Sequence, residues 1–263
     1  MDTPVALPGL RQRKCADLLL DIAVLLMSSG AHTERVNRNL HRITKALGYE
    51  QEILFSLAGI TLTLSDPCDT GAHYTVFRRI KSYGVHLGIV SGVSRMSWKL
   101  CLEGMTIAEL RTEVERLKSL PHYPKPVIIT MIALAGMAFC YLAGGELLAV
   151  LLAGVATAAG FLVRSRFLSS GYNLPLSICA ASFTSSGISG LGIVFHLGIS
   201  PEIAVATSVL FLIPGVPMIN AVIDLLQGHT VTGQGRAMQV TVMAFAIALG
   251  IVLSSALLGI GKL

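Results

Sequence analysis

The sequence has few charged residues, and most of those lie before Pro126. Only 13% of the 263 residues are Asp, Glu, Lys or Arg, whereas 53% are hydrophobic and the mean hydropathy is +0.70. Of 20 Lys and Arg residues only 4 follow Pro126, and of 15 Asp and Glu residues only 3 do. This composition excludes an ordinary soluble protein. It predicts a soluble-type domain at residues 1–120, a Pro-rich linker at 121–126 and a membrane domain at 127–263. The net charge of +5 is too small to indicate nucleic-acid binding.

The chain also lacks the motifs of disulfide, metal and nucleotide sites. Its five cysteines include no CxxC pair, so we interpret them as small hydrophobic residues in a reducing compartment. The histidines of the first domain show no metal-ligand spacing, and no GxxxxGKS or GxxxxGKT loop is present. We therefore expect no metal, no cofactor and no ATP hydrolysis.

No signal peptide is evident, because Pro4 and Pro8 interrupt the first residues and Asp17 and Asp21 interrupt the apolar segment that follows. The first domain is therefore expected to remain in the cytoplasm. Helical apolar spacing alternates there with Ile- and Thr-rich segments, which predicts a small α+β domain. The expected helices span 18–26, 33–47, 85–102 and 107–120, the last capped by Thr106, and the expected strands are a hairpin at 52–65 and a segment at 74–80.

The second domain divides into about five membrane spans, each near the roughly 17–25 residues that a bilayer requires. They are 127–143, 147–163, 174–197, 203–226 and 237–258. With a cytoplasmic N-terminus, the predicted outer loops hold no Lys or Arg, whereas Arg164, Arg166 and Arg236 fall at inner ends, in agreement with the positive-inside rule. Five spans leave the C-terminus, with Lys262, on the outer side.

The fourth span is interrupted at Leu212-Ile-Pro-Gly-Val-Pro-Met-Ile-Asn220. Pro214, Gly215 and Pro217 cannot continue a helix, since each proline lacks an N–H and clashes with the preceding turn. A break at membrane depth must be buried in protein or face a watery cavity, and transporters bind small ions at such breaks. With Pro217 at position N1 of a second half-helix, the N–H groups of Met218 and its neighbours favour an anion such as a carboxylate.

Acidic residues in this span are candidates for ion coupling. Asn220 and Asp224 are spaced i, i+4 and share one helix face, and an acid within a span is a functional hypothesis by default. The alternative is that Asp224 lies near the cytoplasmic interface and only caps or pairs there. Glu202 begins the span, where it either gates an outer mouth or lies at the interface.

The third span carries hydroxyl side chains on one helix face: Ser182, Ser185 or Ser186, and Ser189. They either bond across closely packed helices or line a polar route, so Ser182, Ser186 and Ser189 are candidate substrate contacts. Gly187-Ile-Ser-Gly190 also matches the GxSG of intramembrane serine proteases. The single histidine of the spans, His196, is about two turns (roughly 10 Å) away on the same helix, so we expect no enzyme.

Four separated motifs resemble those of the threonine/serine exporter family. They are Ser29-Gly-Ala-His-Thr-Glu-Arg-Val36, Leu47-Gly-Tyr49, Tyr123-Pro124 and Pro214-Gly-Val-Pro-Met-Ile-Asn-Ala-Val-Ile-Asp224, in the family's order over nearly the whole chain. Full-length members continue into a second membrane half. This chain therefore resembles the separate first-half subunit of split systems, some of which export succinate and related dicarboxylates.

The resemblance implies a bacterial inner-membrane exporter driven by an ion gradient, with Pro214, Gly215, Pro217, Asn220 and Asp224 at its site. The expected substrate is a C4-dicarboxylate such as succinate. Threonine or serine is the alternative, since a dianion needs a cationic contact and no predicted span holds Lys or Arg. The expected partner is a second short membrane subunit, with a homo-oligomer as the alternative. The rival from another class is a membrane-anchored sensor or scaffold.

Overall fold

The computed structural model describes residues 9–121 and 123–260, so the expectations for Pro4, Pro8 and Lys262 lie outside the described residues. The chain forms two compact units. The first unit joins the residues up to Pro121 with Gly215–Met238, and the second joins His122–Pro214 with Gln239–Leu263. The segment Gly215–Met238, which the sequence places in the membrane domain, thus packs with the N-terminal domain.

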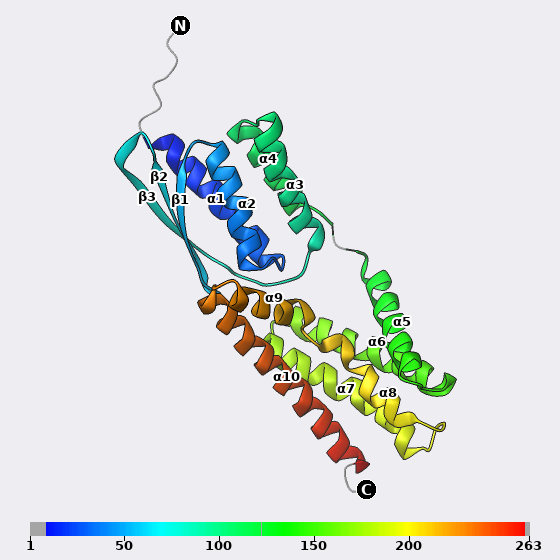
Figure 1. Cartoon of the computed structure of the whole chain (residues 1–263). Coiled ribbons are helices and arrows are strands. Elements are labelled where there is room, and N and C mark those ends of the chain that lie inside the picture. The colour runs from blue at the N-terminus through cyan, green and yellow to red at the C-terminus, as the bar shows by residue number, and fades with distance from the viewer. Residues whose placement is uncertain (1–8, 122, 261–263) are drawn as a thin grey trace. The chain divides into compact units, whose positions relative to one another are not determined.

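The N-terminal part of the first unit contains a three-stranded antiparallel sheet and four helices (Figure 1). The sheet has the order β1 (Glu50–Phe55), β2 (Gly59–Asp66), β3 (Asp69–Arg79). The helices are α1 (Leu10–Ser28), α2 (Thr33–Ala46), α3 (Leu87–Glu103) and α4 (Ile107–Lys118). The predicted hairpin, third strand and four helices are confirmed. Thr106 caps α4 as expected, in a capping box with Glu109.

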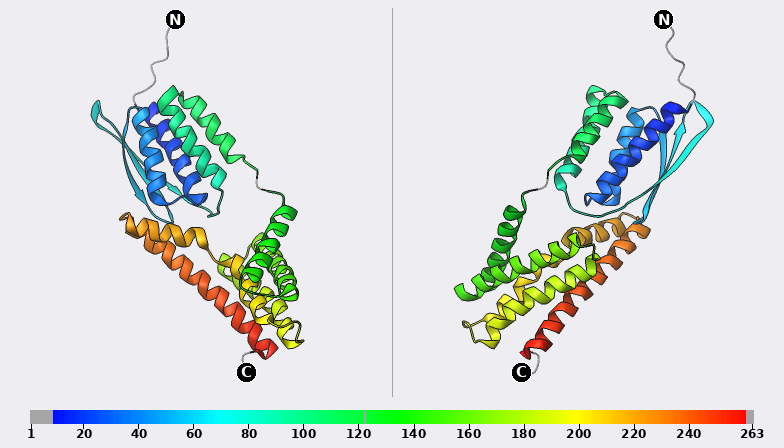
Figure 2. Two further views of the ribbon diagram at one scale, coloured as in Figure 1. Left: turned by 45° about the vertical axis from the view of Figure 1, so that its right-hand side comes forward. Right: turned by 180° about the vertical axis from the view of Figure 1, so that it is seen from behind.

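Helix α1 is the centre of this unit and is longer than its apolar spacing predicted. It begins at Leu10 rather than residue 18, because polar Gln12 is also buried and donates to the Leu64 carbonyl at 2.8 Å. The side chains of β2 that face inward, Ile60, Leu62 and Leu64, are buried with α1 in one core. Figure 2 shows the sheet on one side of α1 and α2, and α3 and α4 on the other.

The first unit is completed by α9 (Gly215–Leu226) and the first residues of α10 (Thr230–Leu258). These two helices are joined by a short turn in which Gly228 has φ +82°. The expected last span began at residue 237, yet α10 begins at Thr230, so Arg236 lies within a helix rather than in an inner loop. The polar start of α10 packs with the N-terminal domain, which the hydropathy of the span alone does not reveal.

The second unit is built from apolar helices. It contains α5 (Lys125–Leu142), α6 (Leu147–Ser169), α7 (Leu174–Val194), α8 (Pro201–Ser208), the 3-10 turn η1 (Leu210–Leu212) and the remainder of α10. Helix α6 packs against α5, α7 and α8. Among the described residues four helices are long and apolar enough to cross a membrane, or five if Pro201–Leu212 and Gly215–Leu226 form one broken span. This agrees with the expected number.

Two span boundaries differ from the sequence expectation. Helix α6 continues to Ser169 rather than ending at residue 163, so Arg164 and Arg166 are helical residues and not loop residues. Helix α7 ends at Val194 rather than at residue 197. The loop that follows contains Gly198, which has φ +87°. Hydropathy misses the end of α6 because the last turns of that helix are polar.

Candidate functional site

The helix interruption lies at Ile213 and Pro214, between η1 and α9. Helix α9 begins at Gly215, so Pro217 is its third residue and not its first, which corrects the prediction. Proline is tolerated here because the N–H groups of the first turn have no intrahelical acceptor. Of the first three residues of α9, Gly215 and Val216 therefore carry the free amides, whereas the sequence assigned them to Met218 and its neighbours.

The carboxylate of Asp224 is fully buried and contacts the start of α2. Its Oδ1 accepts a hydrogen bond from the backbone N–H of Thr33 at 2.8 Å, and its Oδ2 accepts one from the Thr33 hydroxyl at 2.8 Å. Thr33 is the first residue of α2, and the helix dipole favours a negative charge at this end. These are the capping contacts that the sequence left as one of two interpretations of Asp224. Its role in ion coupling stays a prediction.

Arg236 supplies the opposite charge. Its Nε lies 3.4 Å from Oδ2 of Asp224, and one terminal nitrogen donates to the Ala31 carbonyl at 3.0 Å. The side chains of Arg236 and Asp224 are 6% and 0% exposed. Breaking such a buried pair by removing one partner is costly, because the other charge is left uncompensated. The pair therefore joins α9 and α10 to the loop before α2.

Asn220 makes a parallel contact one turn earlier on α9. Its Nδ2 donates to the Gly30 carbonyl at 2.9 Å, so the predicted shared face of Asn220 and Asp224 is the face that meets the α1–α2 loop. Gly30 has φ +90°, and a Cβ there would lie 3.2 Å from the Gly84 carbonyl oxygen. The hydroxyl oxygen of Thr232 lies 3.1 Å from that of Thr33. We call these five residues the Asp224 cluster: Thr33, Asn220, Asp224, Thr232 and Arg236.

His32 caps the helix that the Asp224 cluster holds. Its Nδ1 accepts the backbone N–H of Arg35 at 3.3 Å. Burial lowers the pKa of His32, and although the charge of Asp224 opposes this, the nearby arginines add to it. The lowered pKa favours the neutral ring, which is the form that can accept a hydrogen bond at Nδ1.

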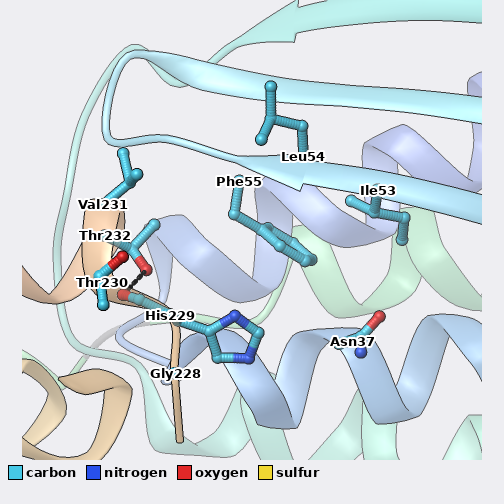
Figure 3. A pocket seen from close by; sticks show the side chains of 9 residues that line it. All are labelled: Asn37, Ile53, Leu54, Phe55, Gly228, His229, Thr230, Val231 and Thr232. Atoms are coloured by element: carbon cyan, nitrogen blue, oxygen red, sulfur yellow. Dashed lines mark hydrogen bonds between the residues drawn. The ribbon is translucent and has the colours of Figure 1, made fainter.

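A pocket of about 210 Å³ lies between β1, α2 and the α9–α10 turn (Figure 3). One side is apolar, from Ile53 to Phe55, and Asn37 and His229 are on its polar side. The side chain of His229 is 25% exposed, and its Nε2 lies 3.3 Å from a carboxylate oxygen of Glu34. The backbone N–H of His229 donates to the Asp224 carbonyl at 2.8 Å, which connects the pocket wall to the Asp224 cluster.

The serine stripe of α7 is buried, and its hydroxyls bond to three other helices. The bonds are Ser182 to the Ile247 carbonyl at 2.8 Å, Ser185 to the Ala156 carbonyl at 3.0 Å, Ser186 to the Ser254 hydroxyl at 2.6 Å and Ser189 to the Ser208 hydroxyl at 2.8 Å. These contacts favour the packing interpretation. The proposed roles of Ser182, Ser186 and Ser189 as substrate contacts stay predictions.

The two acidic residues near the predicted outer loops behave differently. Glu146 precedes α6 and accepts the backbone N–H of Ile199 at 2.6 Å, which joins the α5–α6 turn to the α7–α8 loop. Glu202 lies in the first turn of α8, is exposed, and has no ion pair with any residue that the structure describes. Its gating role stays a prediction.

A family model described as "Putative threonine/serine exporter" matches residues 17–258. The chain belongs to this family. Over 252 residues it is 26% identical to the probable succinate transporter subunit YjjP of Klebsiella aerogenes, an alignment that covers 95% of this chain and 96% of the relative. It is 25% identical over 256 residues to the protein of the same name from Escherichia coli K12, covering 95% of this chain and 97% of that relative.

A third relative of this exporter family is longer. The chain is 23% identical over 258 residues to a probable threonine/serine exporter of Mycobacterium tuberculosis, covering 96% of this chain and 48% of the relative. No solved structure matches the chain. The family is one of exporters, and its members are membrane proteins, in agreement with the apolar helices of the second unit.

Two of the motifs that carried the family resemblance meet in the Asp224 cluster. The segment Ser29–Val36 supplies Gly30, Ala31 and Thr33, and the segment Pro214–Asp224 supplies Asn220 and Asp224. The sequence alone did not distinguish Thr33 within its motif, and Arg236 was predicted only as a charge of an inner loop. One feature of the sequence could have indicated the pairing: Asp224 lies near the end of an apolar helix with no cation close to it in the sequence, so a cation from elsewhere in the chain was to be expected.

Proposed function

We propose that this chain is one subunit of a secondary exporter of small carboxylates in a bacterial inner membrane, with succinate or another C4-dicarboxylate as substrate. Family membership and the two relatives named succinate transporter subunits support this. The word subunit in those names supports a second membrane subunit as partner. The N-terminus lies in the cytoplasm in this proposal, and the C-terminus on the outer side.

One observation carries the proposal: the helix that follows the break is held by a buried, charge-paired contact. Asp224 of α9 accepts two hydrogen bonds from Thr33 and pairs with Arg236. A passive membrane anchor has no need of an interrupted helix with a buried acid after it. A transporter does, since its substrate site must open and close as an ion binds.

The proposed cycle follows from these contacts. The segment Pro214–Asn220, with the free amides at the start of α9 and with Met218 and Asn220 beyond them, binds a carboxylate of the substrate. Asp224 carries the coupling proton. A proton on Asp224 removes the charge that Arg236 and the α2 dipole compensate, and thereby weakens the hold of the N-terminal domain on α9. Glu202 gates the outer side.

Threonine or serine is the second candidate substrate, favoured by the name of the family and of the Mycobacterium tuberculosis relative. The test is efflux of labelled succinate and labelled threonine from cells that contain the chain with its second subunit, compared with cells that lack both. We expect faster succinate efflux that depends on the proton gradient. Faster threonine efflux alone would identify the second candidate, and no change in either would favour the sensor or scaffold.

The coupling role is tested with Asp224→Asn, which keeps the shape of the side chain and removes its charge. We expect succinate efflux to lose its dependence on the proton gradient. Glu103→Gln, at an exposed position of α3, is the matched control and should behave as the wild type. Unchanged gradient dependence in Asp224→Asn, with normal amounts of protein in the membrane, would refute the coupling role.

A further inference from the structure

Arg164 is a cation within helix α6 that forms no ion pair with any residue the structure describes. It lies in α6, five residues before the helix ends at Ser169, in a helix long and apolar enough to cross a membrane. Its Nε is buried and has no hydrogen-bond partner among residues 9–121 and 123–260. Burying part of a guanidinium without a partner is unfavourable, so a residue of this kind needs either a structural or a functional explanation.

No carboxylate of the second unit is placed to pair with Arg164. The acidic residues of that unit are Glu146 and Glu202. Glu146 immediately precedes α6, so 18 residues of rise, about 27 Å, separate it from Arg164, and its carboxylate already binds the α7–α8 loop. Glu202, in the first turn of α8, forms no ion pair with Arg164 or with any other residue that the structure describes.

Arg164 shares a helix face with the contact between α6 and η1. Gly160 lies one turn before it, at the i, i+4 spacing that places two residues on one face. A Cβ on Gly160 would lie 3.2 Å from the ring of Phe211, and the rings of Phe161 and Phe211 are 6.5 Å apart. Phe211 precedes Pro214 by three residues, so Arg164 lies one helical turn from a residue that contacts η1, the element of the second unit that ends just before the break.

From this placement we propose that Arg164 is the cationic contact for a carboxylate of the substrate, and that it makes the exporter selective for dicarboxylates over amino acids. The guanidinium offers a planar pair of donors that matches a carboxylate. A C4-dicarboxylate has two carboxylates, one of which can bind Arg164, whereas threonine carries an ammonium group that Arg164 repels. Hydropathy predicted no cation inside a span because it placed the end of this span at residue 163, whereas α6 continues to Ser169.

This inference rests on the proposed export of small carboxylates and identifies its substrate class. The structural alternative is that Arg164 only extends its charge to the inner membrane surface. The two explanations differ in one respect: a substrate contact changes which substrate is preferred, while a surface anchor changes only how much protein reaches the membrane.

The test compares Arg164→Gln with Arg166→Gln, an exposed arginine two residues further along the same helix. Cells with each full-length variant and the second subunit are assayed for efflux of labelled succinate, monomethyl succinate and threonine, normalised to the amount of protein in the membrane. We expect Arg164→Gln to raise the half-saturating succinate concentration about tenfold or more and to abolish the preference for succinate over its monoester. Arg164→Lys should recover part of the preference, and Arg166→Gln should match the wild type.

The outcomes separate this inference from the proposed function. Succinate export with an unchanged preference in Arg164→Gln overturns the role of Arg164 and leaves the exporter intact. An equal loss in Arg166→Gln also overturns it, since a general effect of inner positive charge would then explain both. A wild-type chain that exports threonine but not the dicarboxylate overturns the selectivity. Export of neither compound overturns the proposed function and this inference with it.

Discussion

Thr33 and Asp224 are 191 residues apart in the chain and are joined by two hydrogen bonds of 2.8 Å each. One uses the backbone N–H at the start of α2 and the other uses the threonine hydroxyl, so both carboxylate oxygens are occupied. Arg236 adds its charge at 3.4 Å. Helix α9, which follows the break, therefore cannot separate from the α1–α2 loop unless the buried ion pair is exposed to solvent or neutralised. These contacts connect α9 directly to the N-terminal domain.

The first prediction concerns the energy of this pair. Asp224→Asn and Arg236→Gln should each lower the free energy of unfolding by about 3–5 kcal/mol, because each leaves one buried charge without its partner. The double variant should lose less than the sum of the two, since no lone charge remains. Denaturant unfolding of the purified protein in micelles measures all three values.

The control for this comparison of single and double variants is the ion pair of Glu113 and Arg116 on α4, whose side chains are 29% and 58% exposed. Glu113→Gln, Arg116→Gln and their combination should change stability little, because solvent screens exposed pairs. Additive effects of Asp224→Asn and Arg236→Gln would show that the two side chains do not interact.

The sequence predicted the features that local pattern determines. Apolar run lengths predicted about five spans, the two prolines predicted the break, and Thr106 predicted the start of α4, because each depends on residues within a few turns. The start of α9 was displaced by two residues for a physical reason. Proline is acceptable anywhere in a first turn, so Pro214 and Pro217 bound the helix start without fixing it.

Local sequence pattern could not predict the partners of Asp224. They are Thr33, 191 residues earlier in the chain, and Arg236 of α10, and both depend on tertiary packing that no periodicity encodes. Arg236 was misplaced because hydropathy recognises only the apolar part of α10. The helix also includes the polar segment Thr230–Gly235, which packs with the N-terminal domain.

The second prediction concerns Gly30 in the loop that Asn220 contacts. Gly30→Ala should destabilise the protein more than Gly48→Ala. Both glycines have positive φ, at +90° and +82°, so each alanine pays about 1 kcal/mol for the left-handed conformation. Only at Gly30 does the new Cβ also meet other atoms within 4 Å, of which the nearest is the Gly84 carbonyl oxygen at 3.2 Å. Equal losses of melting temperature would show that the close approach has no energetic effect.

The third prediction is a pH dependence from His32. Burial lowers the pKa of this cap below its ordinary value of about 6.5, so the unfolded chain binds the proton first as pH falls. The stability contributed by the neutral ring is therefore present above about pH 6.5 and is lost as pH falls through the lower, folded-state pKa. Unfolding measured from pH 7.5 to 5 should show a steeper loss for the wild type than for His32→Ser, which keeps a capping oxygen and does not titrate. Identical slopes would refute a contribution from His32.

The fourth prediction separates the two interpretations of the serine stripe. Ser182→Ala removes the donor to the Ile247 carbonyl. Since interhelical hydrogen bonds in membrane proteins contribute about 0.6 kcal/mol on average, we expect a small loss of stability and an unchanged half-saturating concentration for succinate efflux. Ser169→Ala, at the exposed end of α6, controls for the loss of a serine hydroxyl that bonds only within its own helix. If Ser182→Ala instead raised the half-saturating concentration without changing stability, the hydroxyl would contact the substrate, and the stripe would line the route of export.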